Sequence, residues 1–77
     1  MDDDHQELVR RLFAAVTALI ETAHEAAIAG QSEALTAGAY AGAARRLQAA
    51  ARDITALAAA AAVIAGLSDG DASSRPD

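Results

Sequence analysis

Apolar residues recur at alternating steps of three and four in two segments of this 77-residue chain. This spacing is the a/d pattern of helices that pack along one seam. It predicts a first helix over about residues 5–29 and a second over about residues 36–67. The first seam consists of Val9, Leu12, Val16, Leu19, Ala23 and Ala26, and the second of Tyr40, Ala43, Leu47, Ala50, Ile54, Leu57, Ala61 and Ile64.

Polar residues and a glycine mark the ends of the first helix. Residues 1–4 form an acidic lead, and Asp4 and Glu7 have the spacing of an N-terminal capping box. Gly30 is a suitable stop because glycine adopts the left-handed conformation at little cost. The loop is therefore predicted over residues 30–35.

The second helix has two possible N-caps, Thr36 and Ser32. Thr36 is the better one, because Leu35 before it and Tyr40 after it have the spacing of a hydrophobic staple. At the other end, residues 68–77 contain no large apolar side chain. They are expected to form a disordered acidic tail.

The two seams can be aligned with each other by folding the chain back at the loop. Pairs whose residue numbers sum to 66, such as Leu12 with Ile54 and Leu19 with Leu47, then face each other. The match continues over six layers of side chains. It predicts an all-α fold, an antiparallel two-helix hairpin.

A second apolar face lies beside the seams, and we call it the flanking face. A hairpin this small, with no cysteine to form a disulfide, is expected to need further burial to fold stably. A second copy could place Phe13 and Ile20 against the alanines of its partner, which predicts a homodimeric four-helix bundle. The flanking face consists of Phe13, Ile20, Ala27, Ala44, Ala51, Ala58 and Ala65.

The run Ala56–Leu67 has no polar side chain and is apolar on every side of the predicted helix. It is too short to span a bilayer, which takes about 20 residues, so we expect no membrane span. A helix that is apolar all round is usually surrounded by protein. The run is therefore expected to contact another protein or a larger oligomer as well.

The net charge of −5 comes from the two ends of the chain. Between Glu7 and Leu67, five acids balance five arginines, so nucleic acid is an unfavoured partner. The alternative is a small nucleic-acid-associated regulator that uses the arginine stripe of Arg45, Arg46 and Arg52. The acidic N-terminus and the lack of cysteine favour a cytoplasmic location.

One group of residues has the types and spacing of a metal site. Glu21, His24 and Glu25 lie within one helical turn, as metal ligands do in ferritin-like bundles. They fall on the outer face and the second helix supplies no facing carboxylate, so a solvated surface is favoured over a metal site.

No nucleophile constellation and no glycine-rich phosphate loop occur in the sequence. We therefore expect no enzymatic activity and no cofactor. The favoured function is a non-enzymatic, self-associating helical hairpin that acts through protein contacts, as a small adaptor, regulator or assembly factor. The ferritin-like metal-binding bundle is the less favoured alternative.

Overall fold

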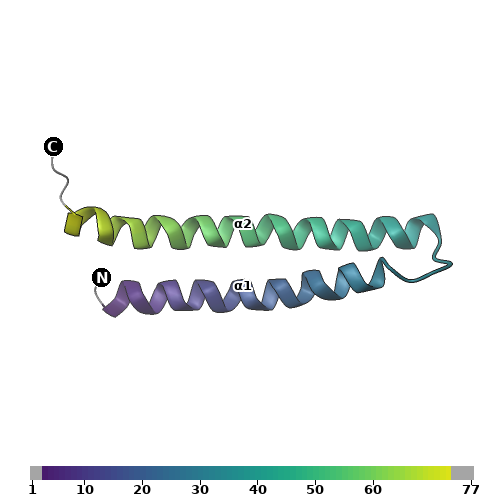
Figure 1. Cartoon of the computed structure of the whole chain (residues 1–77), viewed down its shortest axis with the longest axis horizontal. Coiled ribbons are helices and arrows are strands. Elements are labelled where there is room, and N and C mark those ends of the chain that lie inside the picture. The colour runs from purple at the N-terminus through teal and green to yellow at the C-terminus, as the bar shows by residue number, and fades with distance from the viewer. Residues whose placement is uncertain (1–2, 74–77) are drawn as a thin grey trace.

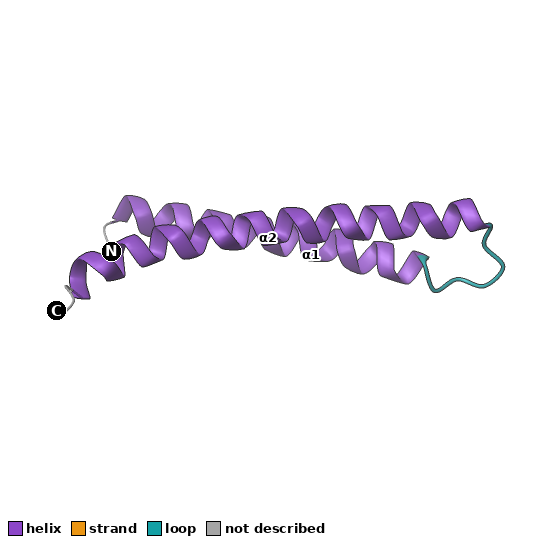
Figure 2. Cartoon of the chain, turned by 90° about the horizontal axis from the view of Figure 1, so that it is seen from above, coloured by secondary structure: helices purple, strands orange, loops and turns teal. Residues whose placement is uncertain are grey.

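The computed structural model describes residues 3–73, which form two helices joined by one loop. Helix α1 spans Asp3–Ala29 and helix α2 spans Ala37–Ser73. The helices lie side by side and antiparallel, so that both ends of the chain are at the open end of the hairpin (Figure 1). Seen from above, they cross at a shallow angle, as helices packed along one seam do (Figure 2). The predicted all-α antiparallel hairpin is confirmed.

The hairpin is a single layer of helices. Its extents are 59 × 26 × 13 Å, and a helix with its side chains is about 10–12 Å across. Each helix therefore has a neighbour on one side only. Among the side chains described, in residues 3–67, none is less than 2% exposed.

The contact between the helices follows the two predicted seams. All of the buried apolar residues belong to these seams, and most other seam residues are half-buried. Tyr40 and Leu47 are the exceptions, at 41% and 39% exposed. Tyr40 lies near the loop, where the facing seam residue of α1, Ala26, is only an alanine. The buried residues are Val9, Ala26, Ala43, Ala50 and Ala61.

The first turn of α1 differs from the predicted capping box. The helix includes Asp3, so Asp4 lies inside it and is not the N-cap. The Glu7 carboxylate accepts hydrogen bonds from Arg10 and Arg11. The prediction was wrong because these two arginines are within reach of Glu7, while the acids of the first turn interact favourably with the helix dipole.

Helix α1 ends one residue before Gly30, as the sequence indicates, but for a different reason. The Gly30 N–H donates to the carbonyl of Ala26 at 3.0 Å, and the Gln31 N–H donates to that of Ile28 at 3.0 Å. No glycine among the described residues has a positive φ. The left-handed residue is Ala34, at φ 64°, a conformation that costs a non-glycine residue about 1–2 kcal/mol.

Thr36 is the N-cap of α2, as predicted, and Ser32 is not. The Thr36 hydroxyl oxygen accepts a hydrogen bond from the Ala39 N–H at 3.0 Å. The Ser32 carbonyl instead accepts a hydrogen bond from the Tyr40 hydroxyl at 2.9 Å. This bond ties the middle of the loop to the first turn of α2.

Helix α2 extends to Ser73, beyond the predicted end at residue 67. Adding a residue to an existing helix is far easier than starting one, so a polar segment can continue a stable helix. The helix thus runs six residues past its predicted end, and the expectation of a disordered tail stays a prediction. Residues 1–2 of the acidic lead and 74–77 of the tail lie outside the described residues.

Candidate self-association surface

The flanking face is open to solvent in the single chain. Phe13 is 60% exposed and Ile20 is 53% exposed. Each follows a half-buried seam residue, Leu12 or Leu19, so both lie on one side of the contact with α2. The remaining residues of the face are exposed or half-buried alanines: Ala27, Ala44, Ala51, Ala58 and Ala65.

A shallow apolar groove of about 310 Å³ lies at the loop end of this face, and we call it the loop-end groove. Ala27 from α1 and Ala44 from α2 both line it. The flanking rows of the two helices therefore lie on the same side of the hairpin there, as the heptad positions predict. The groove is lined by Ala26, Ala27, Gly30, Gln31, Tyr40, Ala43, Ala44 and Leu47.

The groove exists because small residues converge where the helices approach the loop. A side chain carbon built on Gly30 would lie 3.7 Å from the Ala43 side chain, in ordinary van der Waals contact. The sequence pattern shows the alanines and Gly30 but did not predict this groove. Its depth depends on where Tyr40 is held, and the bond to Ser32 fixes that.

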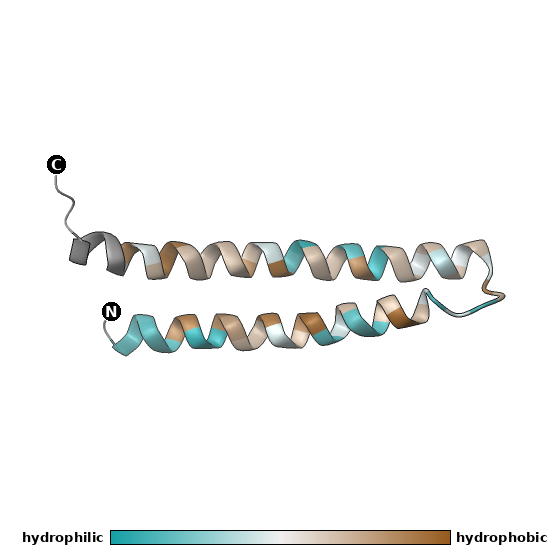
Figure 3. Ribbon diagram, in the orientation of Figure 1, coloured by the Kyte–Doolittle hydropathy of each residue, from teal (hydrophilic) through white to brown (hydrophobic). Residues whose placement is uncertain are grey.

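A second set of exposed apolar side chains lies toward the open end of the hairpin. Val63 is 62% exposed, Leu67 is 59% exposed, and Leu8 of α1 is 43% exposed. Between its middle and the open end, α2 is coloured mainly as apolar (Figure 3). The single chain thus leaves much of the run Ala56–Leu67 uncovered. Ile28, at 52%, is a further exposed residue that the flanking face does not include.

The three metal-site candidates remain on the surface. Glu21, His24 and Glu25 are all exposed. Within the part of the chain that the structure describes, no three His, Cys, Asp or Glu side chains are placed to hold a metal ion. The preference for a solvated surface over a metal site at this group stays a prediction.

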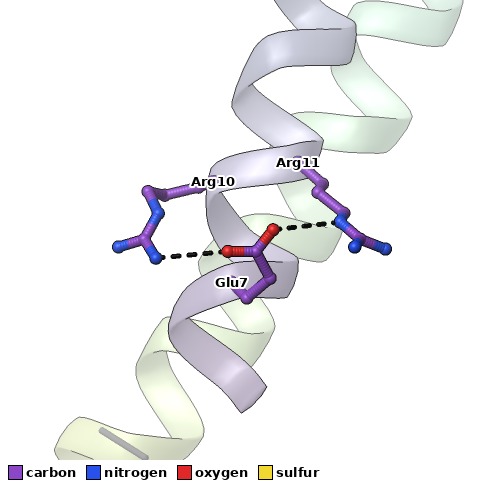
Figure 4. Close-up of polar contacts among 3 residues, drawn as sticks. All are labelled: Glu7, Arg10 and Arg11. Carbon is purple, nitrogen blue, oxygen red and sulfur yellow. Dashed lines mark hydrogen bonds and ion pairs between the residues drawn. The ribbon is translucent and has the colours of Figure 1, made fainter. Parts of the chain in front are cut away.

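The arginines among the described residues fall into two groups. Arg10 and Arg11 pair with the carboxylate of Glu7 at 3.2 and 3.1 Å, as the helical spacing predicts (Figure 4). The hydrogen bond from Arg10, and then that from Arg11, hold the pKa of Glu7 below its ordinary value. The stripe of Arg45, Arg46 and Arg52 is exposed on α2.

By length and composition alone, both helices could cross a membrane. An 18-residue window has a mean hydropathy of 1.4 in α1 and 1.5 in Ala37–Leu67, and 6% and 11% of these windows are buried. A qualifying window of α1 must contain Glu21 near its centre and Glu25 one turn further. A charge at the bilayer centre costs about 2.5–3.5 kcal/mol. The absence of a membrane span stays a prediction.

The chain was compared with known proteins. No protein-family model matches it. Comparisons with curated proteins and with solved structures also find no match.

Proposed function

We propose that this protein is a non-enzymatic helical hairpin that self-associates through its flanking face into a homodimeric four-helix bundle. The observation that carries the proposal is the exposure of Phe13 and Ile20, at 60% and 53%, on one side of a single layer of helices. Domains are generally built from at least two packed layers. A second copy supplies the missing layer.

The exposed area of the chain supports this proposal. A folded monomer of 7.8 kDa exposes about 4,400 Å² on the usual scaling of area with mass. This chain exposes 5418 Å². The excess of about 1,000 Å² is close to the roughly 800 Å² that each partner buries in a standard stable interface.

The dimer then acts through contacts with other proteins, as a small adaptor, regulator or assembly factor in the cytoplasm. Val63 and Leu67 support this part of the proposal. Both lie off the flanking face and are about 60% exposed, so a dimer built on that face leaves them open. An apolar patch of this kind suits a protein partner that docks on Ala56–Leu67.

Light scattering coupled to gel filtration tests the self-association. At micromolar concentration the proposal requires at least twice the chain mass of 7.8 kDa. A folded, helical species of one chain mass would overturn it. Protein that binds labelled duplex DNA at low salt would favour the alternative that uses Arg45, Arg46 and Arg52.

A further inference from the structure

Phe13 and the loop-end groove lie at opposite ends of the α1 row of the flanking face. Phe13 projects from α1 with 60% of its surface exposed, and the groove beside Ala27 has a volume of about 310 Å³. The two positions are 14 residues apart on α1, which corresponds to about 21 Å along the helix. Because each copy carries both features, the Phe13 side chain of each copy can bind in the groove of the other.

We propose that the two hairpins of the dimer lie with their loops at opposite ends, and that Phe13 of each copy inserts into the loop-end groove of the other. This inference rests on the proposed self-association and specifies its geometry. A two-fold axis makes such contacts reciprocal, so that if Phe13 enters the partner's groove, the partner's Phe13 enters this one.

The position of the two-fold axis follows from these contacts. It lies midway between residues 13 and 27 of α1, at Ile20. Ile20 is 53% exposed and meets Ile20 of the partner subunit there. On the other helix, Ala44, Ala51 and Ala58 face the same row of the partner. Their small side chains let the two copies of α2 approach closely.

The alternative dimer has both loops at the same end, and it packs less well. Its two loop-end grooves face each other and merge into an apolar void beside the axis. Protein interiors contain few voids larger than a water molecule, because every unfilled volume loses packing contacts. Phe13 would then lie over Ala58 of the partner subunit, while the loop-end groove stays unfilled.

A spin label in the loop distinguishes these arrangements. The chain has no cysteine, so Glu33→Cys provides a single labelling site at an exposed loop position outside the flanking face. With opposite loops, the two labels lie about 40 Å apart, from the helical rise between the axis and the loop. With both loops at one end, they lie within about 25 Å.

The outcomes separate the two proposals. A dimer with a distance of about 40 Å supports the geometry, and a dimer with a short distance overturns it while leaving self-association intact. A folded monomer with no intermolecular distance overturns both. Ile20→Cys gives a second readout. Oxidation is expected to cross-link it across the axis only in the opposite-loop dimer, because the other arrangement keeps the two sulfurs too far apart.

Discussion

The substitution Phe13→Asp is expected to abolish assembly and to leave the chain largely unfolded at low micromolar concentration. A phenylalanine side chain buries about 150–250 Å², so the 60% exposed in the single chain corresponds to about 120 Å². At about 25 cal/mol per Å², covering it contributes roughly 3 kcal/mol for each copy. The dimer therefore loses roughly 6 kcal/mol, or about four orders of magnitude in the dissociation constant.

An aspartate in that position adds a further cost, because an unpaired buried carboxylate must be neutralised or exposed. Sedimentation velocity measures the mass of the variant, and circular dichroism measures its helicity. The matched control is Ala14→Asp, one residue along on an exposed position, which should leave both unchanged. The reasoning is refuted if Phe13→Asp remains helical and dimeric, since the flanking face is then not the interface.

Three further substitutions and one extraction experiment have defined outcomes. Ala34→Gly should stabilise the fold by about 0.5–1 kcal/mol in chemical denaturation, because glycine accepts a positive φ; an equal destabilisation would contradict the strain at this residue. Glu7→Gln should reduce the fall of melting temperature at acid pH. Because the pKa of Glu7 is lowered in the folded chain, its ion pairs stabilise the fold at pH values above the ordinary pKa, and this stabilisation is lost as pH falls through the lowered pKa. If the pH dependence of the melting temperature were unchanged in this variant, the ion pairs of Glu7 would not be its cause. His24→Ala should leave melting temperature and assembly unchanged within about 0.5 kcal/mol, and loss of a co-purifying metal would revive the metal site. Carbonate extraction of cell membranes should release the protein into the supernatant, whereas retention with the lipid would establish a membrane span.

The seams of the hairpin were predictable because both helices bury side chains along one line. The alternation of three and four residues depends only on helical geometry, and every buried residue, from Val9 to Ala61, belongs to a predicted seam. The Thr36 cap was also predictable, because its hydroxyl accepts a hydrogen bond from a backbone N–H just three residues along the chain. Such local features are determined by short segments of the sequence.

The features that the sequence did not predict are of two kinds. Some depend on which of several partners a side chain contacts, and others on residues from different segments that meet in space. The position of Glu7 in the sequence fits both a capping box and ion pairs with Arg10 and Arg11, and the structure shows the ion pairs. Ala34 is left-handed because the loop must connect two fixed helix ends, although a glycine lies nearby at Gly30. The loop-end groove arises only where small residues from both helices meet, so no single segment reveals it.

The central claim is that folding of the hairpin is completed by association with a second copy. Its most direct test is the dependence of melting temperature on protein concentration, followed by circular dichroism from about 1 to 100 μM. Because association stabilises the folded state by mass action, the account predicts a melting temperature that rises steadily over this range. A melting temperature independent of concentration, with full helicity at the lowest concentration and one chain mass in solution, would contradict it.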